Sequence, residues 1–335
     1  MQRRIGSYVL PRRLDTAAGK PRHVGFELEF AGLDFRGTVD VLEAVFQGKA
    51  AWHSQAEATL RHSEYGDFTV EVDSELAKQL AKSRAEGRGK GKASRDPLAE
   101  WVVNLTTELV PVEVVCPPIP VTRIVELDAM VNGLREAGAE GTAESVVYAF
   151  GVHINTELPS LEPGIIGRYL KAYAIAQDWL VRRHRVDLTR RFTPYIDHYP
   201  SAYRRRVLDY QDDLDMDTLF GDYMEYNATR NRALDMLPLF MHIDEERLLA
   251  QVQDSRIKAR PTFHYRLPNC EIERGDWRLS ESWNLWCVVE ALVENPEQLD
   301  ELVQQCKRYD AQLINLTRAP WHRTLDSILN DLVSA

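Results

Sequence analysis

The stretch His23-Val24-Gly25-Phe26-Glu27-Leu28-Glu29-Phe30 alternates apolar and polar residues, and this alternation predicts a β-strand with two different faces. Glu27 and Glu29 would project from one face, and the intervening apolar side chains would cover the other. Carboxylates at alternate strand positions stand about 7 Å apart and repel by roughly 2 kcal/mol at an effective dielectric of about 20. We therefore expect a cationic group between them, although an amphipathic edge strand with a solvated face would show the same alternation.

Four later segments repeat this arrangement, with apolar residues on one predicted face and chemically capable residues on the other. They are Thr69-Val70-Glu71-Val72-Asp73, Leu109-Val110-Pro111-Val112-Glu113-Val114, the segment 148–155 and the segment 263–267. In the third of these, the small residues Ala149 and Gly151 would let a ligand approach the backbone.

Together the five segments place nine polar residues on strand faces, and none of the nine is a lysine. They are Glu27, Glu29, Glu71, Asp73, Glu113, His153, Asn155, His264 and Arg266. Five acids beside one arginine would repel one another in a shared site unless divalent cations neutralised them. Carboxylates with an occasional imidazole suit Mg²⁺ or Mn²⁺, so the set predicts a metal site rather than a plain solvated surface.

Composition excludes several other classes of protein. A net charge of −10 argues against a specific nucleic-acid-binding protein, and no apolar run approaches the roughly 18 residues of a membrane span. The amino-terminal sequence does not resemble a secretory signal, so a cytoplasmic location is expected. The four cysteines form no CxxC pair and are expected to be reduced thiols.

The order of the predicted elements indicates an α+β fold. Strands with connecting helices occupy the first half, a mostly helical insertion covers about 160–255, and a strand pair follows at 262–273. Further helices are expected at 121–137, 164–185, 283–293, 296–316 and 321–332. Residues 82–95 hold three glycines and six basic residues and predict a flexible loop, either a surface insertion or a mobile flap over an anionic ligand. No repeat is visible, so we expect one domain over 1–335.

Five short motifs resemble, in order, those of the amidoligases. They are Gly25-Phe26-Glu27-Leu28-Glu29-Phe30, Asp73-Ser74, Val112-Glu113-Val114-Val115-Cys116-Pro117-Pro118, Gly151-Val152-His153-Ile154-Asn155 and Tyr265-Arg266-Leu267. The amidoligases belong to the carboxylate-amine ligase superfamily with glutamine synthetase and glutamate cysteine ligase. The resemblance spans about residues 23–275.

The resemblance implies a glutamine-synthetase-like catalytic domain with a curved, mainly antiparallel sheet. Helices would pack on one face, and ATP with two or three Mg²⁺ or Mn²⁺ ions would bind on the other. By position, Glu27, Glu29 and Glu113 look like metal ligands, and Glu27 and Glu29 would also help to bind the nucleotide. His153 lies where the family has a histidine near the transferred phosphate. Arg266 resembles the arginine that steadies the γ-phosphate or the acyl phosphate. His264 stands where the family usually has a metal-binding glutamate, which leaves the second metal open.

The expected reaction is an ATP-dependent condensation of a carboxylate with an amine, through an acyl phosphate and with release of ADP and phosphate. Asp73 is the preferred base for the attacking ammonium group, with Glu71 as the alternative. The substrates would be small molecules or peptides, with no specific nucleic acid and no membrane, and the oligomeric state is open. Two rival functions are a metal-dependent amide hydrolase and a nucleotide-binding module without catalysis.

Overall fold

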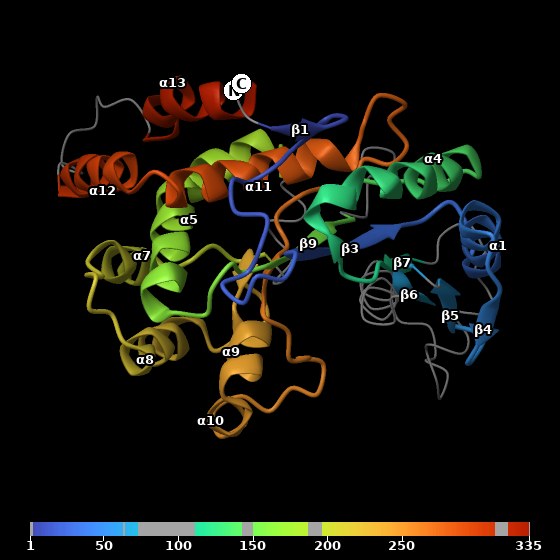
Figure 1. Cartoon of the computed structure of the whole chain (residues 1–335), viewed down its shortest axis with the longest axis horizontal. Coiled ribbons are helices and arrows are strands. Elements are labelled where there is room, and N and C mark those ends of the chain that lie inside the picture. The colour runs from blue at the N-terminus through green and yellow to red at the C-terminus, as the bar shows by residue number, and fades with distance from the viewer. Residues whose placement is uncertain are drawn as a thin grey trace, which may run out of the picture.

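The structure is a computed structural model that describes residues 3–62, 64–72, 111–142, 150–186, 196–311 and 321–334 (Figure 1). The strands are β1 (Arg4–Ile5), β2 (Tyr8–Val9), β3 (His23–Phe30), β4 (Ala50–Trp52), β5 (Glu57–His62), β6 (Gly66–Val72), β7 (Val112–Val115), β8 (Ile119–Pro120), β9 (Val152–Glu157), β10 (Leu234–Asp235) and β11 (Thr262–Tyr265). The helices are α1 (Phe35–Phe46), the 3₁₀ helix η2 (Val121–Leu127), α4 (Asp128–Glu136), α5 (Pro163–Arg183), α7 (Ser201–Leu208), α8 (Met216–Asn227), α9 (Leu237–Ile243), α10 (Glu245–Leu249), α11 (Leu279–Val293), α12 (Pro296–Ala311) and α13 (Trp321–Ser334).

Nine of these strands form one sheet, in the order β10-β11-β9-β3-β7-β6-β5-β4 with β8 also paired to β3, while β1 and β2 pair separately. Every pairing between these strands is antiparallel. The prediction of a mixed fold with a mainly antiparallel sheet is therefore confirmed. Among the described residues, β10 and β4 are the two outermost strands of this sheet. The sheet is not strongly curled, so strand register, rather than the curvature that the resemblance implied, brings the polar side chains together.

Helices cover the apolar face of the sheet. Near β11, the ring of Tyr265 lies 5.2 Å from that of Trp286 in α11. Near the other edge, Phe46 of α1 stacks on Phe68 of β6 with 4.3 Å between ring centroids. In Figure 1, α4 and α11 lie along the same side of the strands. Burial of this face fixes the register, because a shift by one residue would move the aromatic side chains to the polar face.

A buried ion pair ties the start of β3 to the helical layer. Arg22 immediately precedes β3, and its Nη2 lies 2.8 Å from Oε1 of Glu290 in α11. Both side chains are fully buried, and Glu290 also accepts hydrogen bonds from the Tyr169 hydroxyl and the Trp286 indole. A buried charge pair of this kind is tolerated because surrounding donors satisfy the carboxylate. The central strand is therefore anchored at the end from which it enters the sheet.

The helices and strands largely follow the sequence predictions, with one difference in a helix and one in a strand pair. The element expected at 121–137 begins as a 3₁₀ turn, and only Asp128–Glu136 is α-helical. Of the strand pair expected at 262–273, only β11 is an extended strand, and Asn269 makes an isolated bridge to Gly151. Asp73 and the basic loop 82–95 lie outside the described residues. Among the helices that are described, none is both long and apolar enough to cross a membrane.

Candidate metal and nucleotide site

Register places the predicted site residues on one face at the centre of the sheet. Glu27 of β3 is paired with His153 of β9, and Glu29 of β3 is paired with Glu113 of β7. Side chains of paired residues project from the same face, so groups from three strands converge here. His264 of β11 reaches the same group, because its Nε2 lies 3.4 Å from Oε2 of Glu27.

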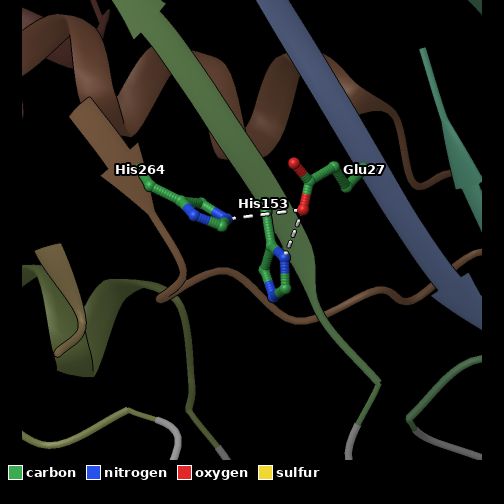
Figure 2. A group of neighbouring side chains, drawn as sticks. All are labelled: Glu27, His153 and His264. Carbon is green, nitrogen blue, oxygen red and sulfur yellow. Dashed lines mark hydrogen bonds and ion pairs between the residues drawn. The ribbon is translucent and has the colours of Figure 1, made fainter. Parts of the chain in front are cut away.

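Glu27 is the hub of this arrangement (Figure 2). Its Oε1 accepts hydrogen bonds from Asn155 Nδ2 at 2.8 Å and from Arg260 Nη1 at 3.1 Å. Its Oε2 lies 3.0 Å from Nδ1 of His153 and 3.4 Å from Nε2 of His264. The carboxylate is buried, and nitrogen groups face both of its oxygens.

The imidazole of His153 lies between the two glutamates of β3. Its Nδ1 contacts Glu27, and its Nε2 lies 3.5 Å from Oε1 of Glu29. The other oxygen of Glu29 accepts a hydrogen bond from the backbone N–H of Gly151 at 2.8 Å. A histidine from the neighbouring strand therefore lies between the two glutamates.

Burial and neighbouring side chains together set the protonation of Glu27 and His264. Burial by itself raises the pKa of the Glu27 carboxyl, but interaction with His264 and hydrogen bonds from both histidines outweigh it and hold that pKa well below its usual value. Burial, together with the positive charge of Arg266, lowers the pKa of His264 well below 6.5. Near neutral pH, Glu27 is therefore a carboxylate and His264 a neutral imidazole.

Arg266 lies behind His264, beside an aspartate that the sequence analysis missed. Its Nη2 lies 3.1 Å from Nδ1 of His264 and 3.4 Å from Oδ2 of Asp235. Asp235 is fully buried in β10, and burial raises its pKa, while Arg266 opposes this effect. An acid between Leu234 and Met236 was the available signal, because a charged residue in an apolar run indicates a buried partner.

Arg260 is the second residue that the sequence analysis missed. It lies in the loop before β11, and its side chain is 32% exposed while its Nη1 contacts Glu27. The side chain of Arg266, in contrast, is 8% exposed. A bound anion could therefore meet the Arg260 guanidinium more readily than that of Arg266.

The row of acids continues outward from Glu29 across the sheet. Glu113 is paired with Glu71 of β6, and Glu71 is paired with Glu57 of β5. Glu29, Glu113 and Glu71 are partly buried, and Glu57 is exposed. Glu71 therefore lies on the site's face, one strand beyond Glu113, as its alternation with valines predicted.

Within the described part of the chain, two groups of side chains have the geometry to hold a metal ion. Glu27, His153 and His264 form one, and Glu29, Glu113 and His153 form the other, with one ligand atom from each residue lying within 4.8 Å of the others. The two groups share His153. The first is rich in imidazole and the second in carboxylate, a difference that affects metal preference.

Two other features lie apart from this site. A cavity of about 380 Å³ at the carboxyl end of α5 is lined by Arg182, Arg185 and Arg274, among others, and no residue of the two metal-binding groups lines it. Cys116 follows β7 and is buried, and burial raises the pKa of its thiol. A thiol in this state is a poor nucleophile, because the thiolate is the reactive form.

Comparison with known proteins identifies the family. The family model described as "Putative amidoligase enzyme" matches residues 20–288, a range that runs from the residues before β3 into α11 and includes every site residue described above. No curated protein matches the chain. Because this match covers well over half of the 335 residues and agrees with the motifs on β3, β7, β9 and β11, the chain belongs to the amidoligase family.

Proposed function

We propose that the protein is an ATP-dependent carboxylate-amine ligase that forms an amide or peptide bond. Membership of the amidoligase family supports an enzyme that forms amide bonds. The observation that carries the finer proposal is the convergence of Glu29, Glu113 and His153 from three strands within 4.8 Å. Carboxylates gathered in this way are the usual means of holding the divalent ions that accompany a nucleoside triphosphate.

The donor set fits a divalent metal. Glu29 and Glu113 are direct cross-strand partners, and like charges in that relationship destabilise a sheet. A divalent cation between them would remove the repulsion, and carboxylate oxygens with one imidazole suit Mg²⁺ or Mn²⁺. When bound, such an ion would neutralise the polyphosphate and raise the electrophilicity of the γ-phosphorus.

The residues of this chain then have distinct tasks. Arg260 would donate hydrogen bonds to phosphate oxygens. Arg266, which is more deeply buried, would stabilise the negative charge on the γ-phosphate or the acyl phosphate. A substrate carboxylate oxygen would attack the γ-phosphorus, and ADP would leave. The amine nitrogen would then attack the acyl carbon, phosphate would leave, and Asp73 or Glu71 would accept the ammonium proton.

The same proposal includes the wider architecture. An antiparallel sheet with carboxylates on one face and helices on the other agrees with a glutamine-synthetase-like catalytic domain, and we propose one such domain over 1–335. The substrates would be a small-molecule or peptide carboxylate and an amine. The net charge of −10 argues against a nucleic-acid substrate.

The test is ADP release from ATP and Mg²⁺ in the presence of mixed amino acids and short peptides, with mass spectrometry of the condensed product. Glu29→Gln is expected to abolish turnover, and circular dichroism checks that the fold is retained. Full activity of Glu29→Gln would contradict the proposal. Amide hydrolysis without nucleotide would identify the rival hydrolase, and metal-supported ATP binding without turnover would identify a module that has lost catalysis.

A further inference from the structure

Three arginines at the carboxyl end of α5 line the cavity of about 380 Å³ and lack acidic partners. They are Arg182, Arg183 and Arg185. None of the ion pairs within the described part of the chain includes any of the three. The guanidinium of Arg183 lies 5.4 Å from the ring centroid of Trp179, a contact that leaves its charge without a counter-ion. In a protein with a net charge of −10, these side chains form an unbalanced positive cluster.

A fourth arginine neutralises the acidic side chains of the cavity wall. Glu271 and Glu281 line the cavity, and both are paired with Arg274, whose Nη2 lies 3.2 Å from Oε1 of Glu281. Arg274 also pairs with Asp276 at 3.1 Å. Because the two glutamates already have this counter-charge, they repel a bound anion less than free carboxylates would, and the arginines of α5 keep the wall positive.

Arg185 has a backbone conformation that an arginine rarely adopts. Its φ is 49°, in the left-handed region that glycine usually occupies just after a helix. The two hydrogen bonds of a helix-terminating turn enclose it. One runs from the Val186 N–H to the Val181 carbonyl at 3.2 Å, and the other from the Arg185 N–H to the Arg182 carbonyl at 3.1 Å. A glycine would make the same turn with less strain, so an arginine here indicates a use for its side chain.

The end of α5 does not require these arginines as hydrogen-bond donors. Cations are favourable at the end of a helix because the last carbonyls lack partners within the helix. Here the carbonyls of Val181 and Arg182 accept the bonds of the turn, and the side-chain amide of Asn269 donates to the carbonyls of His184 and Arg185 at 3.4 and 3.1 Å. The guanidinium groups are therefore available to a ligand.

The amino end of α11 forms another part of the cavity wall. Glu281 and Ser282, which lie near the start of this helix, line the cavity, and the N-cap residue Arg278 makes no side-chain hydrogen bond to the first turn. The amino end of a helix carries a partial positive charge that favours anions. Ser282 is 3% exposed, and no hydrogen bond links its hydroxyl to another described residue. That hydroxyl can therefore donate to a ligand in the cavity.

The cavity lies in the helical layer, behind the strand that bears His264. Tyr169 of α5 stacks with Trp286 of α11, and Trp286 also contacts the ring of Tyr265 on the apolar face of the sheet. His184, which lines the cavity, contacts the Tyr265 hydroxyl through Nε2 at 2.7 Å. Since side chains alternate along a strand, His264 projects from the other face. An anion in the cavity is therefore separate from the polar face of the sheet.

We propose that this cavity binds a small anion with at least two negative charges, carried by phosphoryl or carboxylate groups. Guanidinium groups bind both kinds of oxyanion in bidentate geometry, and several of them together favour a multiply charged ligand. The cavity volume of about 380 Å³ lies in the range of small-molecule sites. This site goes beyond the proposed ligase reaction and does not depend on it, because no residue of the two metal-binding groups lines the cavity.

The test is isothermal titration calorimetry of the full chain with inorganic pyrophosphate and, separately, with citrate. A chelator removes divalent ions, and no nucleotide is present. We expect one binding site for at least one of the two anions, and the tighter of them identifies phosphoryl or carboxylate groups as the preferred ligand. Binding of neither anion at millimolar concentration would overturn the proposal.

Two variants locate the bound anion. Arg182→Gln should weaken binding by about 10- to 100-fold, the loss of one charge-assisted hydrogen bond. Arg205→Gln, which changes an exposed arginine in α7, is the matched control and should leave the affinity unchanged. Arg185→Gly should weaken binding while raising the melting temperature, because glycine relieves the left-handed strain. Equal losses of affinity in Arg182→Gln and Arg205→Gln would overturn the proposal.

A third variant separates this site from the proposed nucleotide site. Arg260→Ala should leave the affinity for pyrophosphate and citrate unchanged, because Arg260 does not line the cavity. A loss of binding in Arg260→Ala but not in Arg182→Gln would place the anion on the polar face and overturn the proposal. Anion binding at the cavity without ADP release would retain this inference and reject the ligase, whereas ADP release without anion binding at the cavity would do the reverse.

Discussion

Glu29 of β3 and Glu113 of β7 face each other as register partners on adjacent antiparallel strands. Two carboxylates in this relationship repel, so the folded protein without a cation contains a local destabilising contact that a bound divalent ion would remove. Thermal unfolding should therefore depend on metal. Binding to the folded state alone adds about 2.7 kcal/mol when the free ion is at 100 times its dissociation constant.

We expect Mn²⁺ to raise the melting temperature of the wild-type protein above that of the chelator-treated protein, and Glu113→Gln to lose this increase. Glu57→Gln, an exposed acid two strands further along the same row, is the control and should keep it. Differential scanning calorimetry with and without chelator measures both. If Glu113→Gln kept the full metal-dependent increase in melting temperature, this would contradict a metal site at Glu113.

Arg260 gives a prediction for nucleotide binding. Its side chain is one-third exposed, and in the proposed function its guanidinium moves from Glu27 to phosphate oxygens. Arg260→Ala should raise KM for ATP by about 10- to 100-fold, the equivalent of one charge-assisted hydrogen bond. Lys258→Ala, an exposed cation in the same loop, should leave KM unchanged. Steady-state kinetics at varied ATP concentration measures KM for both variants. Equal increases in KM would indicate a nonspecific electrostatic attraction between ATP and the loop.

His264 predicts a pH dependence of stability. Burial and Arg266 lower its pKa in the folded protein well below 6.5, whereas the unfolded chain takes up a proton near 6.5. The unfolded state therefore binds more protons below pH 6.5, so this contribution to stability is complete above that pH and is lost as the pH falls. The expected slope is about 1.4 kcal/mol per pH unit.

Urea denaturation between about pH 5 and 6.5, above the range where carboxylates titrate, measures this slope. His264→Gln should flatten it, and His242→Gln, which changes an exposed histidine, should not. A slope that persists unchanged in His264→Gln would mean that another group is responsible.

Glu290 predicts the largest loss of stability. Glu290→Ala would leave the buried guanidinium of Arg22 without its counter-charge, and breaking a buried pair in this way costs about 3–5 kcal/mol. The free energy of unfolding from denaturant titration measures the loss. Lys49→Gln, which removes an exposed ion pair with Glu43, should change it little. Equal stability of the two variants would refute the anchoring role of Arg22.

Period-two alternation was sufficient to predict the faces of β3, β6, β7, β9 and β11, because each strand buries one face against helices. The convergence of Glu29 and Glu113 followed from that pattern once register was known. Helix ends were predictable where proline or glycine stops the pattern, and least so at 121–127, where a 3₁₀ turn precedes the α-helix.

Asp235 and Arg260 were not predictable in the same way. Asp235 lies in a strand of two residues, too short to show a period, and Arg260 lies in a loop. Their relevance comes from contacts with residues 31 and 233 positions away in the chain, which only the tertiary structure supplies.

The ion pair between Arg22 and Glu290 has a consequence for ligand binding. It fixes the entry point of β3, so the strand that bears Glu27 and Glu29 cannot tilt without separating buried charges. The carboxylates are thus preorganised before any ion or nucleotide arrives, and little binding free energy is lost in arranging them. Adaptation to substrates of different size must then come from the loops that surround the rigid central strands.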